Sequence, residues 1–292
     1  MLITFLFLSL DKVLYLLKKI RLYKYLPRYI IYNRFFGDYI NFISYINLKY
    51  IYFFKLKDII YEYPLPLILA ANIKKGDIVV DIGAHQGQYT VLLSKLVGPI
   101  GKVYAFEPDP RNFFILKYRT RKLKNVIIER SAVGNKKSKV KFYLDKSSNV
   151  STIHKDAVIS PITCIEVNMV SLDDYFCNLK DDIALIKIDV EGSEPLVLEG
   201  MKNLINKVKV LIFEIRPFAW KAAGFEPSSI IDKLVLNNFK LIYIDEDFNV
   251  VTKNIEKYVN NNKDVYYHIN IIGINKNYLN DIKNRLQIKY YK

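Results

Sequence analysis

The chain has 292 residues, of which 51% are hydrophobic and 25% are charged. This composition excludes collagen-like, mucin-like and wholly disordered proteins, because there is enough apolar material to bury a core. The 44 Lys and Arg residues outnumber the 29 Asp and Glu residues, which gives a net charge of +15. Such an excess favours an anionic partner such as nucleic acid, acidic lipid or a phosphorylated glycan, and does not choose among them.

Cysteine and histidine are scarce, with two and three residues respectively. Cys164 and Cys177 cannot build a disulfide framework, and neither has a partner at the close spacing of a metal site. The sequence therefore predicts no metal site and a reducing, cytoplasmic location.

Residues 1–75 differ from the rest of the chain, because they hold 12 Lys and Arg against 4 Asp and Glu, many aromatic residues and a single glycine. The first ten residues are apolar, but Asp11 and Lys12 end the run before the roughly 18 residues that a membrane-spanning helix needs. The run also lacks the basic start and small-residue end of a secretory signal. We expect a helical extension on the main domain. The alternative is that residues 1–35 lie on an anionic membrane surface, which would make the protein peripheral.

From residue 76 onward, short apolar runs alternate with segments of helical periodicity. Core strands are expected over residues 77–83, 102–108, 125–130, 183–189, 208–215, 240–244 and 265–274. Helices are expected over 88–97, from a cap at Asp109 and Pro110, from about 193–195, and over 228–237. Two further strands, 140–144 and 165–170, fall outside the repeat. This order predicts an α/β fold, with a doubly wound, mostly parallel, seven-stranded, Rossmann-like sheet in residues 76–275 and a basic tail in 276–292.

Polar residues gather at the predicted strand ends, where ligands bind in such sheets. The first strand runs into D-I-G-A-H-Q-G (81–87), whose G-x-x-x-G spacing matches neither the dinucleotide fingerprint nor the phosphate loop. Gly83 and Gly87 would let the backbone approach a ligand closely. Glu107 follows Gly87 by 20 residues, where doubly wound folds place the carboxylate that binds a ribose. Asp81 beside the turn suits a positively charged ligand, and S-adenosylmethionine has a ribose, an ammonium, a sulfonium and no phosphate.

Several motifs resemble those of the FkbM-type methyltransferases: D-I-G-A-H-Q-G-Q-Y-T (81–90), F-E-P (106–108), L-D-D-Y (172–175), I-K-I-D-V-E-G-S-E (186–194) and the strand ending Phe213-Glu214. The resemblance covers about residues 76–215, and I-K-I-D-V-E-G is its specific part. It implies a class I S-adenosylmethionine-dependent methyltransferase that transfers a methyl group to a hydroxyl of a sugar, glycan or polyketide-like acceptor. The chain departs from the family pattern at His85, where Asn is usual.

The expected cofactor-binding residues are those of the first turn together with two strand-end acids: Asp81, Gly83, Ala84, His85, Gly87, Tyr89, Thr90, Glu107 and Asp189. We expect Glu107 to hold the ribose, and the alternative is an ordinary surface carboxylate. Asp81 is expected near the methionine ammonium, and the alternative is a cap on the following helix. His85 is expected to be a polar loop residue rather than a base.

Methyl transfer to an alcohol requires alignment of the attacking oxygen and removal of its proton. Asp189, Glu191 and Glu214 end two neighbouring predicted strands, so we expect them to form the catalytic carboxylate cluster. Clustering would raise the pKa of one member toward neutrality. The same carboxylates could instead hold a divalent cation, which is not predicted, and Asp189 could simply pair with Lys187 on the same strand face. The polar region 147–163, with Ser151, Thr152 and His154, either covers the substrate or is a solvated hairpin.

Two other functions stay open. An RNA methyltransferase would use the positive charge for phosphate contacts, but the D-V-E-G turn differs from the N/D-P-P-Y-type turn of base-methylating enzymes. More than half of the excess charge also lies in residues 1–75. A binding protein with a relic fold is the second alternative, which the presence of Asp81, Glu107 and Asp189 together disfavours.

Overall fold

The computed structural model describes residues 73–148, 151–155, 158, 160–244, 250–251, 255 and 269–278. Nearly all of the expected N-terminal extension, including the 1–35 segment, and residues 279–292 of the tail lie outside the described residues. None of the helices in the described ranges is long and apolar enough to cross a membrane.

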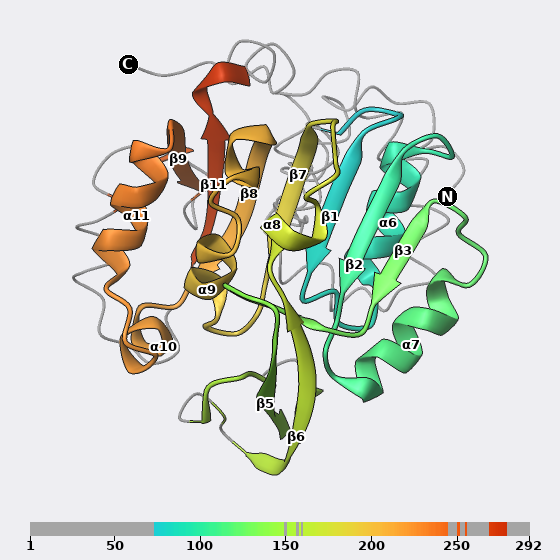
Figure 1. The fold of residues 1–292 in the computed structure, drawn as a ribbon, viewed down its shortest axis with the longest axis vertical. Coiled ribbons are helices and arrows are strands. Elements are labelled where there is room, and N and C mark those ends of the chain that lie inside the picture. Colours follow the sequence, from blue (N-terminus) through green and yellow to red (C-terminus); the bar gives the residue numbers. More distant parts are fainter. Residues whose placement is uncertain are drawn as a thin grey trace, which may run out of the picture. The chain divides into compact units, whose positions relative to one another are not determined.

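The main sheet has eight strands in the order β10-β9-β11-β8-β7-β1-β2-β3 (Figure 1). Its strands are β1 (Ile78–Ile82), β2 (Lys102–Phe106), β3 (Val126–Glu129), β7 (Ile183–Ile188), β8 (Val208–Ile215), β9 (Phe239–Ile244), β10 (Val250–Val251) and β11 (Ile269–Asn275). The block from β3 to β8 is parallel, and β11 runs antiparallel between β8 and β9. The mostly parallel, doubly wound sheet is thus confirmed. Of the strands in this main sheet, the sequence missed only β10, whose two residues carry no periodicity.

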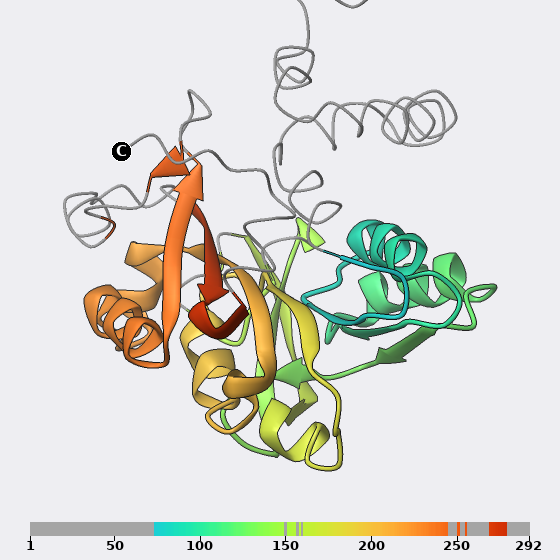
Figure 2. The ribbon, with the colours of Figure 1, turned by 90° about the horizontal axis from the view of Figure 1, so that it is seen from above.

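Helices cover both faces of the parallel strands, which explains why every residue of β7 is buried. Figure 2 shows α6 and α7 on one face and α8 and α9 on the other. The helices are α6 (Gln88–Val97), α7 (Pro110–Thr120), α8 (Leu172–Tyr175), α9 (Glu194–Glu199), α10 (Pro217–Ala222) and α11 (Pro227–Leu236), with 3₁₀ turns at Leu204–Lys207 and Lys276–Tyr278. The expected cap of α7 is confirmed, since the Asp109 side chain accepts a hydrogen bond from the backbone N–H of Arg111.

A second, three-stranded sheet has the order β4-β6-β5, with β4 (Ala132–Val133), β5 (Ser138–Asp145) and β6 (Pro161–Val170). It contains the two strands that were expected outside the repeat. The β5 and β6 strands are antiparallel and extend past the carboxyl ends of β1 and β2 (Figure 1). The second sheet therefore lies on the side of the main sheet where its strand-end residues gather.

The strand order places a topological switch point at β1. The chain leaves β1 for β2 on one side, and later enters β7 on the other side. The turns that follow β1 and β7 therefore diverge, and this is where a ligand site forms in doubly wound sheets.

Candidate active site

The turn after β1 is built from backbone hydrogen bonds and two glycines. The N–H groups of Gly83 and Ala84 both donate to the carbonyl oxygen of Phe106, each at 3.0 Å. Gly83 has φ +75° and Gly87 has φ +86°, values that L side chains rarely adopt. A β-carbon on Gly87 would also lie 2.7 Å from Leu116 Cδ1. The two glycines thus allow a tight turn and let α6 start close to its neighbouring helix.

Asp81 is fully buried in β1. Its Oδ2 accepts a hydrogen bond of 2.6 Å from Thr90 Oγ1, whereas its Oδ1 finds no donor among the described residues. Burial raises the pKa of Asp81, and the positive charge of Lys187 opposes that rise. The alternative role as a helix cap is wrong, because the N-cap residue of α6 is Gly87 and no side chain caps this end of the helix. Asp81 therefore offers a buried acceptor beside the glycine turn.

Glu107 follows β2 and is 5% exposed, so it is not an ordinary surface carboxylate. Its Oε2 accepts the backbone N–H of His85 at 2.7 Å, and its Oε1 accepts that of Asp109 at 2.8 Å. Burial raises the pKa of Glu107 to about 8, although the two N–H donors oppose the rise. The carboxylate thus ties the glycine turn to the start of α7, and each oxygen retains a second lone pair.

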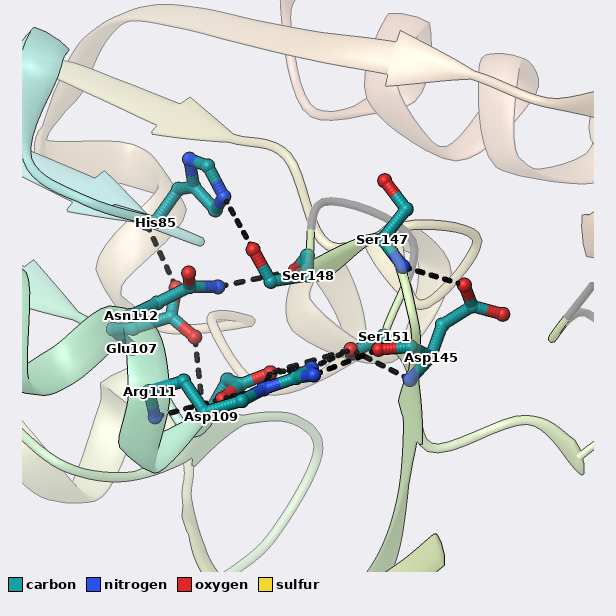
Figure 3. Close-up of polar contacts among 9 residues, drawn as sticks. All are labelled: His85, Glu107, Asp109, Arg111, Asn112, Asp145, Ser147, Ser148 and Ser151. Carbon is teal, nitrogen blue, oxygen red and sulfur yellow. Dashed lines mark hydrogen bonds and ion pairs between the residues drawn. The ribbon is translucent and has the colours of Figure 1, made fainter. Parts of the chain in front are cut away.

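His85 has φ +50° and connects the glycine turn to the segment that follows β5. Its Nε2 lies 3.2 Å from Ser148 Oγ (Figure 3). Burial lowers the pKa of His85, so its ring is neutral near pH 7. Its contacts are those of a neutral polar loop residue.

Asp189 follows β7 and pairs with Lys187, whose Nζ lies 2.8 Å from Asp189 Oδ2. The Lys187 side chain is 5% exposed and the Asp189 side chain 34%. Burial disfavours the charged form of Asp189, but attraction to Lys187 and their hydrogen bond outweigh this and lower its pKa. Tyr89 places its ring under the same ammonium, with Lys187 Nζ 4.9 Å from the ring centroid. The ion pair considered from the sequence is present, and it leaves Asp189 ionised and partly exposed.

Glu191 and Glu214 both contact Arg216, a residue that was not predicted from the sequence to belong to the site. The guanidinium of Arg216 contacts the Glu191 carboxylate, and its Nε lies 3.2 Å from Glu214 Oε2. Burial and the charge of Asp189 raise the pKa of Glu191 to about 8 and that of Glu214 well above its ordinary value. The three strand-end acids therefore divide into Asp189, whose pKa is lowered, and two carboxyl groups whose pKa values are raised.

Glu194 is a second missed residue, and it is fully buried at the start of α9. Its Oε1 accepts the backbone N–H groups of Val190, at 3.0 Å, and Gly192, at 3.3 Å. Its Oε2 accepts the Nε1–H of Trp220 at 2.8 Å. Glu194 thus fixes the D-V-E-G turn from the inside. In the sequence, Glu194 stands at the end of the I-K-I-D-V-E-G-S-E motif and in a first helical turn, and neither signal gives it a role.

Two of the three polar residues named in the 147–163 region, Ser151 and Thr152, have structural partners. Thr152 exchanges two backbone hydrogen bonds with Tyr143, and Ser151 contacts Asp145 and Arg111. His154 Nε2 is buried and has no hydrogen-bond partner within the described ranges. Nor do those ranges contain a group of three or more His, Cys, Asp or Glu side chains placed to hold a metal ion.

Among curated proteins, the chain is similar to a hexuronic acid methyltransferase, AglP, from Haloferax volcanii. The two are 25% identical over 201 residues, which are 66% of this chain and 78% of that protein.

Similar solved structures include the methyltransferase FkbM from Methylobacillus flagellatus KT, with 16% identity and a TM-score of 0.42 over 69% of this chain and 44% of that one. This chain thus spans less than half of that protein. The fibrillarin from Aeropyrum pernix, solved with bound S-adenosylmethionine, has 14% identity and a TM-score of 0.40, over 70% of this chain and 68% of its own. An rRNA methylase from Streptococcus thermophilus has 15% identity and a TM-score of 0.42, over 72% of this chain and 93% of that one.

The sequence pattern of the methyltransferase FkbM domain matches residues 81–241, which are more than half of the chain. The match begins at Asp81, includes the glycine turn, Glu107 and the D-V-E-G turn, and ends in β9. The protein is an S-adenosylmethionine-dependent methyltransferase and belongs to the FkbM family.

Proposed function

We propose that the enzyme transfers the methyl group of S-adenosylmethionine to a hydroxyl of a sugar or glycan. The observation that carries this proposal is the strand-end cluster, in which Asp189 is ionised while Glu191 and Glu214 have raised pKa values. Titratable groups whose pKa values are pushed apart by their surroundings are typical of acid–base sites.

The proposed cofactor site comprises the glycine turn, its flanking polar residues and the two strand-end acids: Asp81, Gly83, Ala84, His85, Gly87, Tyr89, Thr90, Glu107 and Asp189. Its chemistry fits the cofactor. The buried Asp81 Oδ1, which has no donor in the described ranges, suits the cationic methionine end. Both oxygens of Glu107 have spare acceptor capacity for the two hydroxyls of a ribose.

When bound, S-adenosylmethionine supplies a methyl carbon activated by the sulfonium. Asp189 would accept a hydrogen bond from the acceptor hydroxyl, and thereby orient one oxygen lone pair toward that carbon. As the oxygen–carbon bond forms and the carbon–sulfur bond breaks, Asp189 would take the hydroxyl proton. Lys187 holds this carboxylate ionised and fixed beforehand, through its 2.8 Å contact.

Glu191 and Glu214 would bind the acceptor beside Asp189. In their protonated forms they donate a hydrogen bond and add no negative charge, so both can contact sugar hydroxyls. Arg216 contacts the two carboxyl groups and keeps them adjacent.

The similarity to a hexuronic acid methyltransferase supports a sugar acceptor. To test the proposal, the full-length enzyme would be incubated with methyl-labelled S-adenosylmethionine and with separate glycan, lipid and RNA fractions of cells. Label should enter the glycan fraction, or lipid that carries glycan, and the Asp189→Asn variant should transfer far less. Transfer into RNA alone would overturn the acceptor class.

We also propose that the basic residues 1–35 bring the enzyme to anionic membrane, where lipid-linked glycans are available. These residues lie outside the described part, so the sequence alone supports this proposal. Full-length protein should bind anionic liposomes at low salt, and protein lacking residues 1–35 should not, with unchanged affinity for the cofactor. Equal binding by both forms would refute the role of the segment.

A further inference from the structure

A polar turn, residues 145–148, follows β5 on the side of the proposed cofactor site. The turn begins at a fixed point, because Tyr143 and Thr152 exchange backbone hydrogen bonds of 2.8 and 3.2 Å. The Asp145 carboxylate then accepts the backbone N–H of Ser147 at 2.9 Å. These local contacts therefore set the conformation of the turn independently of the main sheet.

Arg111 fastens the start of this turn to α7. Its Nη1 donates to the carbonyl oxygen of Asp145 at 2.8 Å, and its Nη2 lies 3.2 Å from Ser151 Oγ and 2.6 Å from Asp109 Oδ2. Asp109 is 1% exposed and is the cap of α7. One guanidinium thus joins the helix that follows Glu107 to both ends of the segment after β5 (Figure 3).

Ser148 carries the turn to the glycine loop. Its carbonyl oxygen accepts a hydrogen bond from Asn112 Nδ2 at 3.0 Å, and its hydroxyl lies 3.2 Å from His85 Nε2 (Figure 3). The backbone N–H of His85 in turn donates to Glu107. Two hydrogen bonds therefore connect Ser148 to the carboxylate that we assign to the ribose.

Asn112 provides an independent sign that a polar group binds here. It is 2% exposed, and its Oδ1 is buried with no hydrogen-bond partner among the described residues. A buried acceptor without a donor is costly unless a water molecule or a ligand satisfies it.

We infer that residues 145–148 form a wall of the cofactor site, and that Ser148 and Asn112 are positioning residues that hold His85 over Glu107. This inference rests on the proposed role of Glu107. His85 has a left-handed backbone, which is costly for an L residue, and the contact of its ring with Ser148 helps to hold the residue in place. Loosening this contact would let the His85 N–H move away from Glu107 and would weaken cofactor binding.

The test measures the dissociation constant of S-adenosylmethionine by calorimetry on the full chain. Ser148→Ala and His85→Asn both remove the side-chain contact, and Asn tolerates the φ of His85. Each change should weaken binding by about threefold to tenfold, the range of one hydrogen bond. The double variant should lose no more than either single variant, because both remove the same contact. Ser148→Thr keeps the hydroxyl and should restore binding.

The matched control is Arg121→Met, at the other end of α7, where the guanidinium lies 3.7 Å from the Tyr118 ring centroid. It should leave the dissociation constant unchanged. Hydrogen exchange adds a readout that a merely structural role would not move: S-adenosylhomocysteine should protect the amides of residues 145–148 in the wild type, and less in Ser148→Ala.

The Glu107→Ala variant separates the assignment of Glu107 to the ribose from the inference that residues 145–148 form a wall of the cofactor site. If Glu107→Ala loses affinity while folded Ser148→Ala and His85→Asn bind as the wild type does, the wall is refuted and the ribose assignment stands. If Glu107→Ala binds normally, the ribose assignment fails, and the Ser148 and His85 variants still decide whether the turn contacts the cofactor.

Discussion

A β-carbon on Gly83 would lie 1.8 Å from the carbonyl oxygen of Asp189. The turn after β1 and the turn after β7 are thus in direct backbone contact, and Asp189 also donates its N–H to the carbonyl oxygen of Ile82 at 3.0 Å. The position of the proposed cofactor turn and that of the proposed base are therefore linked through the backbone itself.

Gly83→Ala should unfold the protein more easily and abolish cofactor binding. Left-handed backbone costs an L residue about 1–2 kcal/mol, and overpacking adds about 1–3 kcal/mol. Gly224→Ala is the control, because Gly224 also has a positive φ but no atom within 4 Å of the added carbon. Urea unfolding should show a larger loss for Gly83→Ala, and equal losses would contradict the close contact.

Glu107→Ala should weaken S-adenosylmethionine binding by about tenfold to a hundredfold, because charge-assisted hydrogen bonds to the ribose are lost. Calorimetry on folded protein measures this change. An unchanged dissociation constant would remove Glu107 from the ribose site.

Cofactor affinity should rise with pH through neutrality. Burial raises the pKa of Glu107 to about 8, so the free protein holds this group largely protonated at pH 7. Ribose hydroxyls favour the ionised form, so binding releases a proton below the pKa and strengthens until the group is ionised in the free protein as well. Glu107→Gln should flatten the profile between about pH 6 and 9. If the variant keeps the wild-type slope, another group titrates.

Asp189→Asn should reduce the rate of methyl transfer by about 100-fold or more, because the amide cannot take a proton, and it should change cofactor affinity far less than Glu107→Ala does. Glu214→Gln should act in the same direction, and the double change should be less than additive if the two residues work together. Lys187→Met tests the purely structural role. Asp189 is only an ion-pair partner if two results are found together. Lys187→Met and Asp189→Asn would lower the free energy of unfolding to the same extent, and the folded Asp189→Asn enzyme would transfer methyl groups at the wild-type rate.

Glu194→Gln should destabilise the protein by about 1–3 kcal/mol, since an amide cannot accept all three hydrogen bonds that Glu194 receives. Trp220, the sole tryptophan of the chain, donates one of these bonds, so its fluorescence reports both unfolding and the local change. Glu199→Gln on the same helix is the control. Glu199 pairs with the exposed Lys233 at 3.8 Å, and such pairs contribute about 0–1 kcal/mol. Equal effects of the two changes would show that Glu194 does not hold the turn.

The sheet could be predicted from the sequence because its strands are apolar runs that alternate with helical periodicity. The position of Glu107 at the end of β2 followed from its spacing to Gly87. Helices α8 and α10 could not be predicted, because four and six residues are too few to show a period, whereas the equally short α9 was predicted from its start near residues 193–195.

The contacts that shape the site could not be predicted from the sequence, because their partners lie far apart along the chain. His85 meets Ser148 across 63 positions, and Arg216 meets Glu191 across 25. Neither pair follows from local spacing. Glu194 was missed because its acidic side chain points inward, against the usual preference of such residues at a helix start for solvent.

The chain enters and leaves the second sheet at neighbouring positions. Ala132 and Val133 of β4 pair in parallel with Met169 and Val170 at the end of β6, so the excursion between them begins and ends side by side. The length and side chains of β5 and β6 can therefore vary without moving β3 or β7. Evolution could exchange this segment as a module, and an engineer could graft it from one relative to another, while the eight-stranded sheet keeps its register, if the new segment restores the contacts of Asp145 and Ser148 with α7 and His85.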